Sequence, residues 1–355
     1  MPFFTRPRGG LILLLAAALL SGCNTVVMNP AGDIARQQAH LIVVSTVLML
    51  LIIVPVIVLT LLFAWRYRQS NTRATYTPDW DHSTALELVI WGAPLLIIIA
   101  LGLLTWITTH TLDPYRPLQR LDDTRAVPVG AKPLEVQVVA MDWKWLFIYP
   151  EQGVATLNEM AAPVDRPITF KITASTMMNS FYVPALAGQI YAMAGMQTQL
   201  HAVINQPGRY EGFSANYSGA GFSDMRFKFL GLSEQDFDAW IERNRQAGGE
   251  LTRQRYLELE HPSVREPVQR FAHVDASLFN AVLNRCVDGS KICMGEMMAI
   301  DASGGAGPYT FEVADRGLSV EPRPRTPRRY VMAQACTAAD PSGRATPIAA
   351  PLHLN

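Results

Sequence analysis

The sequence is poor in charged residues, and the charges that it has are balanced. Only 17% of the 355 residues are charged, with 30 Lys and Arg against 30 Asp and Glu, whereas 49% are hydrophobic. Because a balanced chain lacks the excess of basic residues typical of nucleic-acid binding, we expect no nucleic-acid partner. The chain is apolar for a soluble protein but too polar for a bundle buried wholly in lipid. The composition therefore predicts a few membrane spans attached to a sizeable water-exposed domain.

Cysteine is also scarce, and the first of the four cysteines follows a short apolar run near the N-terminus. Arg6 and Arg8 precede a short apolar run at 11–20, and Leu-Ser-Gly then leads directly into Cys23. This layout is typical of a bacterial lipoprotein signal, with 1–22 removed and Cys23 acylated as the mature N-terminus. The alternative is an uncleaved signal anchor with an incidental cysteine, but the apolar run is short for a membrane span.

Two long hydrophobic runs follow, at 41–64 and 86–107. Each exceeds the roughly 20 residues that a membrane-spanning helix needs. The loop between them is basic, with Arg66, Arg68 and Arg73, and the positive-inside rule makes it cytoplasmic. We therefore predict that 23–110 forms a lipidated N-terminus and a two-helix transmembrane hairpin in the bacterial inner membrane. The residues that follow the hairpin are then periplasmic.

Glu87 interrupts the apolar pattern at the cytoplasmic start of the second run. Ionisable groups in membrane segments are often parts of proton relays, which makes Glu87 a candidate functional residue. The alternative is an interfacial carboxylate that simply stays hydrated.

The pattern changes to a period of two from Lys132 onward. Alternation at 134–138, 168–172, 197–204 and 225–229, separated by turn residues, predicts an antiparallel β-sandwich over 111–231. Helical spacing returns over 232–300, where Ser233 precedes an apolar stripe of Phe237, Trp240 and Ile241. Residues 301–355 show no periodicity and are predicted to be disordered.

The remaining cysteines indicate the compartment. Cys286 and Cys293 flank a turn-rich stretch, and in an oxidising compartment we expect them to form a disulfide. The alternative is a metal site with Met294, Met297 and Met298, which has no histidine to support it. The state of Cys336 is left open.

The loop within 213–229, FSANYSGAGFSDMRFKF, has the residue pattern of a copper-binding loop but contains no Cys, His or Glu. Together with MDWKWLFIYPEQG at 141–153, MNSF at 178–181 and QIYAMAGMQ at 189–197, it resembles subunit II of haem-copper terminal oxidases, in the quinol-oxidising cytochrome bo branch. The resemblance runs from about Cys23 to Phe279 and does not cover the tail beyond Cys286. It implies a membrane-anchored protein with a two-helix transmembrane hairpin, an all-β cupredoxin-like sandwich in the periplasm and a helical C-terminal extension.

In the cytochrome c-oxidising branch of that family, the corresponding domain holds a binuclear copper centre. Its ligand positions fall here on Asn179, Asn216, Ser218, Ala220, Asp224 and Phe227. These side chains cannot supply the thiolate and imidazole ligands that copper needs, so we expect no metal site. Two alternatives are a hard-cation site from Asp224 with the two asparagines, and Cu(I) capture by scattered methionines. Both are weaker than loop capping by Asn and Asp and core packing by Met.

The resemblance implies a structural subunit of a proton-pumping quinol oxidase that reduces O2 to water with electrons from ubiquinol. The haems and a copper ion are then expected in the large partner subunit, with none in this chain, and the partners are subunits I, III and IV and membrane lipid. Trp143 and Trp145 are expected to pack in the core or against a partner. The resemblance also implies a role for Glu87, because related oxidases have a glutamate at the matching position, near the entrance of a proton channel. The rival functions are a copper electron-transfer subunit and a free-standing exported lipoprotein.

Overall fold

The computed structural model describes residues 25–75, 77 and 79–302. The expectations for the signal peptide at 1–22, for Cys23, for the tail from 303 and for Cys336 lie outside the described residues. The chain divides into two compact units at Gly295. Of the second unit, the structure describes the part of helix α7 (Met294–Ala302) that follows Gly295.

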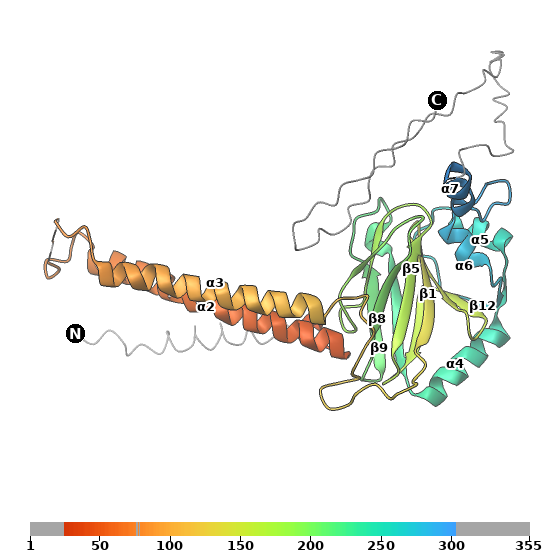
Figure 1. Cartoon of the computed structure of the whole chain (residues 1–355), viewed down its shortest axis with the longest axis horizontal. Coiled ribbons are helices and arrows are strands. Elements are labelled where there is room, and N and C mark those ends of the chain that lie inside the picture. The colour runs from red at the N-terminus through yellow and green to blue at the C-terminus, as the bar shows by residue number, and fades with distance from the viewer. Residues whose placement is uncertain (1–24, 76, 78, 303–355) are drawn as a thin grey trace, which may run out of the picture. The chain divides into compact units, whose positions relative to one another are not determined.

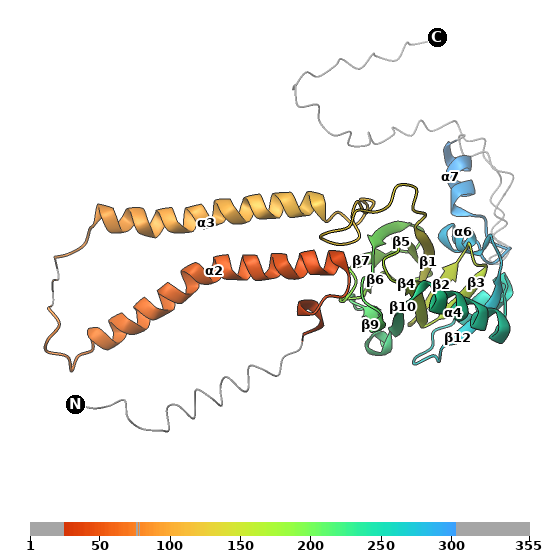
Figure 2. The ribbon, with the colours of Figure 1, turned by 90° about the horizontal axis from the view of Figure 1, so that it is seen from below.

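Two long helices, α2 (Asp33–Arg66) and α3 (Thr84–Thr111), follow a short 3₁₀ helix, η1 (Val26–Met28). Both are longer than the apolar runs because polar turns extend them at each end. In the described part of the chain, these two helices are long and apolar enough to cross a membrane. Pro55 lies inside α2, and Figure 2 shows that this helix is bent, as expected when proline removes a backbone hydrogen bond.

Two β-sheets form a sandwich (Figure 1). Within the described residues, one sheet has the strand order β11-β12-β3-β2-β1-β5-β8 and the other has the order β4-β10-β9-β6-β7. The strands before α4 are β1 (Leu134–Met141), β2 (Lys144–Tyr149), β3 (Val154–Leu157), β4 (Glu159–Pro163), β5 (Ile168–Ala174), β6 (Asn179–Tyr182), β7 (Ile190–Ala192), β8 (Thr198–Ala202), β9 (Gly208–Ser214) and β10 (Arg226–Leu232), with the 3₁₀ helix η2 (Phe222–Asp224) before β10.

The predicted alternation correctly identifies the face that points between the sheets. In β5, Ile168, Phe170 and Ile172 are buried, while the residues between them are partly exposed. The pairing is more mixed than predicted, because β1 pairs with β5 in parallel and β4 pairs with β10 in parallel. Most other pairs are antiparallel, as expected for short alternating strands.

The C-terminal region contains the predicted helices and also two strands that the sequence analysis missed. Its elements are α4 (Glu234–Ala247), β11 (Gly249–Leu251), α5 (Arg253–Glu260), β12 (Gln269–Val274) and α6 (Leu278–Leu283). Ser233 caps α4 by accepting a hydrogen bond from the Asp236 backbone, and the predicted stripe on α4 is buried. Strand β12 pairs with β3, so the C-terminal region extends the larger sheet.

These C-terminal elements cover the outer face of the larger sheet. A second hydrophobic core joins Val139, Leu146 and Ile148 of the sheet to Tyr256 and Phe271 of the C-terminal region. Every residue of β2 is therefore buried, which explains why this strand lacks polar alternation.

The start of α2 is attached to the sandwich through its backbone. The amides of Ala31 and Gly32 both donate to the carbonyl of Ala185 at 2.9 Å, and Gly32 forms a β-bridge with Ile204. A Cβ at Gly32 would lie 2.5 Å from the carbonyl oxygen of Val203. Glycine is therefore required for this close backbone approach.

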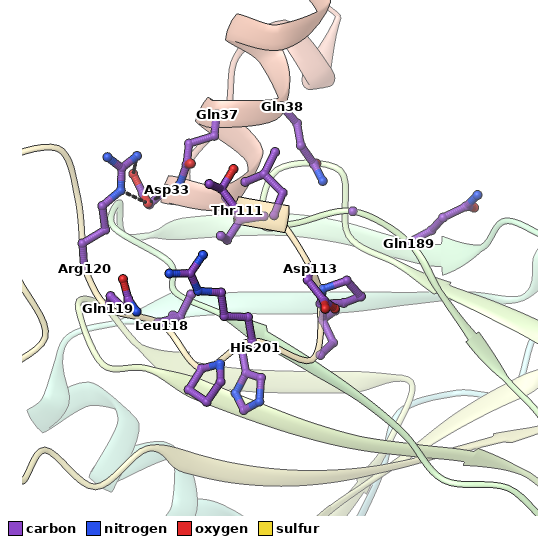
Figure 3. A pocket seen from close by; sticks show the side chains of 17 residues that line it. Asp33, Gln37, Gln38, Thr111, Asp113, Leu118, Gln119, Arg120, Gln189 and His201 are labelled. Carbon is purple, nitrogen blue, oxygen red and sulfur yellow. Dashed lines mark hydrogen bonds and ion pairs between the residues drawn. The ribbon is translucent and has the colours of Figure 1, made fainter. Parts of the chain in front are cut away.

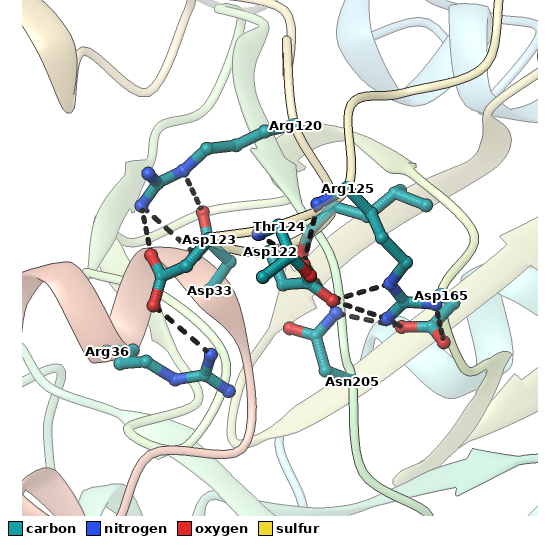
Figure 4. A network of polar contacts seen from close by, with 10 residues as sticks. Asp33, Arg36, Arg120, Asp122, Asp123, Thr124, Arg125, Asp165 and Asn205 are labelled. Carbon is teal, nitrogen blue, oxygen red and sulfur yellow. Dashed lines mark hydrogen bonds and ion pairs between the residues drawn. The ribbon is translucent and has the colours of Figure 1, made fainter.

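Charged side chains strengthen the same junction (Figure 4). Asp33, in the first turn of α2, is fully buried and receives two hydrogen bonds from Arg120, at 2.9 and 3.2 Å. Nearby, Arg125 donates to both carboxylate oxygens of Asp165 at 2.8 Å, and these bonds hold the pKa of Asp165 below its usual range. The loop 112–126 is thereby fixed to both α2 and the sandwich.

Candidate functional site

The positions that correspond to copper ligands lie around one end of the sandwich. Asn179 begins β6, Phe227 lies in β10, and Asn216, Ser218, Ala220 and Asp224 lie in or near the loop that joins β9 to β10. The structure brings Asn179 and Asn216 to the same hydrogen-bonded cluster, whereas Asp224 and Phe227 contact other partners. The Ser218 side chain is buried, and Ala220 is exposed.

Asn179 is buried and uses its amide within the protein. Its Nδ2 donates to the carbonyl of Met177 at 3.1 Å, and its Oδ1 accepts from the Ser214 hydroxyl at 3.0 Å. Asn216 Nδ2 donates to the carbonyl of Met178 at 3.2 Å. Both asparagines thus hold the loop backbone, as this residue type commonly does.

Asp224 and Phe227 point to separate surroundings. The Asp224 carboxylate forms an ion pair of 3.1 Å with Arg265, which comes from the loop after α5. The Phe227 ring stacks on Phe181 with centroids 5.4 Å apart and also contacts Trp145 and Phe147. An aromatic cluster therefore occupies the space around the position of the family's methionine ligand.

Trp143 supports the remaining part of the loop. Its Nε1 donates to the Ser218 carbonyl at 3.1 Å, and its ring lies so close to the loop that a Cβ at Gly221 would be 2.5 Å from it. Trp145, by contrast, is fully buried between the sheets. The loop conformation is therefore held by an indole ring and by hydrogen bonds, and Ala220 is exposed.

The residues at these six positions do not fit a copper centre, because they supply neither thiolate nor imidazole. Among residues 25–302, apart from the two gaps, no group of three or more His, Cys, Asp or Glu side chains lies close enough to hold a metal ion. Met141 and Met225 are buried in the core, whereas Met177, Met178 and Met196 are exposed.

Glu87 lies in the first turn of α3 and is paired with a histidine. Its Oε1 is 2.8 Å from His82 Nδ1, and the two side chains are 50% and 62% exposed. The other ring nitrogen of His82 lies 3.1 Å from the Thr84 hydroxyl. The pair is therefore accessible from solvent and anchored at the helix start.

The structure joins Cys286 and Cys293 in a disulfide. Cys286 itself is buried, so the bridge fixes the segment after α6 to the second hydrophobic core. The metal alternative for this segment would need thiols that are used in the bond.

Lys144 and Arg265 are two residues whose roles the sequence analysis missed. Lys144 is buried, and its ammonium donates to the His261 carbonyl at 2.8 Å and to the Ser263 hydroxyl. Burial lowers its pKa. A lysine inside the apolar run of 143–149 is a signal that a polar partner exists, but the sequence does not say which segment supplies it.

Comparisons with known proteins identify the family. Residues 152–229 match the family model described as Cytochrome C oxidase subunit II, periplasmic domain, and residues 245–290 match the COX Aromatic Rich Motif. The chain is 47% identical over 276 residues to the cytochrome bo(3) ubiquinol oxidase subunit 2 of Pseudomonas putida, covering 78% of this chain and 85% of the relative. The chain belongs to the quinol oxidase subunit 2 family.

Two further relatives in the quinol oxidase subunit 2 family come from different bacteria. Ubiquinol oxidase subunit 2 of Acetobacter aceti is 49% identical over 82% of this chain and 92% of its own length. Quinol oxidase subunit 2 of Bacillus subtilis is 38% identical over 72% of this chain and 78% of its own length. The chain is thus a membrane-anchored subunit of a quinol oxidase, as the motifs in its sequence predicted.

Proposed function

We propose that this chain is the structural subunit of its quinol oxidase and carries no redox centre of its own. One observation carries the proposal, namely the surroundings of the six copper-ligand positions. Asn179 and Asn216 are hydrogen-bonded within the protein, Asp224 is ion-paired, and Phe227 is packed against aromatic rings. Ser218 is buried, and Ala220 is exposed and has no ligand atom. Asn, Ala and Phe supply neither thiolate nor imidazole, so the electron route of the copper-bearing relatives is closed.

Electrons then reach the oxygen-reducing centre without passing through this subunit. Ubiquinol is soluble in the membrane and delivers electrons to haem in the large catalytic subunit, where haems and a copper ion reduce O2 to water and protons are pumped. This chain joins that subunit I together with the small subunits III and IV. Its hairpin and sandwich contribute architecture and assembly.

The membrane arrangement follows from charge and from the N-terminus. Arg66 at the end of α2 and Arg68 and Arg73 in the loop that follows favour the cytoplasmic side for that loop and the periplasm for the sandwich. Cys23, ten residues before the start of α2, is the proposed lipidation site in the inner membrane.

Membership of the complex is tested by blue-native electrophoresis of solubilised membranes. We expect this chain to migrate with haem-bearing subunits, and the purified complex to show haem absorption. A chain that migrates alone, without haem, would instead support a free-standing exported lipoprotein.

Metal analysis tests the absence of copper from this subunit. We expect the chain, separated from the purified complex after loading with excess copper, to retain no stoichiometric copper and to show no near-infrared absorption. A control variant with all positions restored (Asn179→His, Asn216→Cys, Ser218→Glu, Ala220→Cys, Asp224→His and Phe227→Met) supplies the ligands that the natural chain lacks. Stoichiometric copper in the natural chain would overturn the proposal.

Glu87 is proposed as the entrance of a proton-uptake route shared with the large subunit. A carboxylate at the cytoplasmic start of an apolar helix can collect protons from water and pass them to polar groups inside the membrane. The contact of 2.8 Å with His82 supports this role, because a second titratable group at hydrogen-bond distance extends the collecting site.

Replacing Glu87 by glutamine or alanine is expected to slow quinol oxidation by less than about tenfold, which corresponds to about 1.4 kcal/mol in the barrier. The reason is that protons can still enter the route directly from water, but less efficiently. Steps limited by proton uptake during reduction of the active site should slow most, and Glu87→Asp should recover much of the rate. Stopped-flow spectroscopy of the haems measures these steps.

The His82 contact supplies a control for this experiment. If the two side chains act together, His82→Gln combined with Glu87→Gln should be no slower than Glu87→Gln alone. Wild-type rates in both Glu87→Ala and Glu87→Gln complexes with normal haem content would make Glu87 a simple interfacial anchor.

A further inference from the structure

A pocket of about 270 Å³ lies where the first turn of α2 and the end of α3 meet the sandwich (Figure 3). Asp33 and Gln37 line it from α2, Asp113 and Arg116 from the segment after α3, and His201 from β8. The volume is slightly below the range typical of pockets for drug-sized ligands, so it suits a small polar group.

Acidic and basic residues line the pocket in equal numbers, but one pair of them forms an ion pair and the other does not. Two aspartates and two arginines line it. Asp33 and Arg120 neutralise each other at 2.9 Å. Asp113 accepts a hydrogen bond from the Tyr115 backbone through Oδ1 at 2.9 Å. Among the residues that the structure describes, neither Asp113 nor Arg116 forms an ion pair. The pocket thus offers one cation and one carboxylate.

His201 adds a neutral polar group on the sandwich side. Burial lowers the pKa of its ring, so the imidazole is uncharged at neutral pH. Its Nδ1 lies 3.2 Å from the Thr169 hydroxyl, and its backbone amide donates to the carbonyl of Pro114. The ring can donate or accept a hydrogen bond without changing the charge balance.

The position and the apolar part of the lining indicate a membrane lipid. The pocket adjoins the ends of both candidate membrane helices, and Ile34, Leu112 and Leu118 contribute apolar surface beside the polar groups. The aliphatic surfaces of α2 and α3 continue from this point and are exposed in the chain. A ligand with a polar head and apolar chains matches a polar pocket that continues into the aliphatic surfaces of the two helices.

We propose that this pocket binds the headgroup of a zwitterionic phospholipid of the phosphatidylethanolamine class. Arg116 binds the phosphate through charge-assisted hydrogen bonds, and the free oxygen of Asp113 accepts from the ammonium group. A headgroup with zero net charge matches a lining with equal numbers of acidic and basic groups, whereas phosphatidylglycerol would leave an unbalanced negative charge. The proposal rests on the membrane arrangement proposed above.

Photo-crosslinking of the intact complex tests the site. The complex is reconstituted into vesicles that contain a phosphatidylethanolamine probe with a diazirine next to its glycerol, and labelled peptides are identified by mass spectrometry. We expect label on the peptide that contains 111–120. It should fall about fivefold in Arg116→Gln and Asp113→Asn, the effect of about one charge contact at a membrane surface. The matched control Arg209→Gln removes an exposed arginine of β9 and should leave the label unchanged.

Three comparisons make the result decisive. A phosphatidylglycerol probe that labels the peptide equally would overturn the role of Asp113, and loss of label on adding excess inorganic phosphate would indicate a site for free phosphate. Label on α2 and α3 without label on 111–120 would overturn the pocket while leaving the membrane arrangement intact. Absence of label from both helices would overturn both, and haem content of each sample shows that the complex is assembled.

Discussion

Replacing Arg120 by alanine is expected to lower the unfolding midpoint of the chain by about 6–12 °C. Asp33, its partner, has a side chain that is only 1% exposed, and Arg120 supplies two of its hydrogen bonds. Without the guanidinium, the buried carboxylate keeps only the hydrogen bond from Gln37 at 2.8 Å. Removing the partner of a buried charge lowers the free energy of unfolding by about 3 kcal/mol. This value is the lower end of the usual range, because Arg120 itself is partly exposed.

The control for this variant lies in the same network. Arg36 is 3.8 Å from Asp123, and both side chains are substantially exposed. Arg36→Ala should change the free energy of unfolding by less than about 1 kcal/mol, since exposed ion pairs contribute little. Thermal unfolding in detergent, followed by tryptophan fluorescence, compares the two. Equal midpoints for both variants would show that Asp33 finds another partner or water when Arg120 is removed.

Replacing Gly212 by alanine is expected to destabilise the sandwich by about 2–3 kcal/mol. Gly212 in β9 is the cross-strand partner of Phe227, and a Cβ there would lie 2.0 Å from the Phe227 ring. The ring cannot move away easily because Phe181 stacks on it and Phe147 lies 4.9 Å from it, centroid to centroid. The added methyl group must therefore displace a packed aromatic cluster.

Two further variants separate this clash from a general effect of replacing glycine. Gly249→Ala places a methyl group in open space and should be nearly neutral. Combining Gly212→Ala with Phe227→Leu should cost less than the sum of the two single changes, because the smaller side chain makes room. Strict additivity in denaturant unfolding would refute the clash as the cause.

The aromatic cluster and an ion pair hold together the segments around the copper-ligand positions. In the described structure, Phe227, Trp143 and the Asp224–Arg265 ion pair hold the segments that a metal would otherwise join. Residues of the β9–β10 loop thus gain partners from β1–β2 and from the segment after α5. The aromatic residues lie in or next to strands whose alternation the sequence shows. Arg265, by contrast, lies in a loop, and no sequence pattern identifies it as the partner of Asp224.

Local signals in the sequence were sufficient for the spans, the alternating strands and the α4 helix. Run length predicted α2 and α3, a period of two predicted the inward face of β5 and β8, and Ser233 marked the start of α4. These features depend on residues a few positions apart, so the chain encodes them directly.

Tertiary structure alone decided which distant segments meet. The sequence does not reveal that β12 extends the sheet at β3, that Arg120 reaches Asp33 or that Lys144 binds the carbonyl of His261. The pocket beside Asp113 and Arg116 also exists only because α2, α3 and β8 converge there. Such contacts join residues tens of positions apart, and their free energy depends on burial and geometry that no local pattern contains.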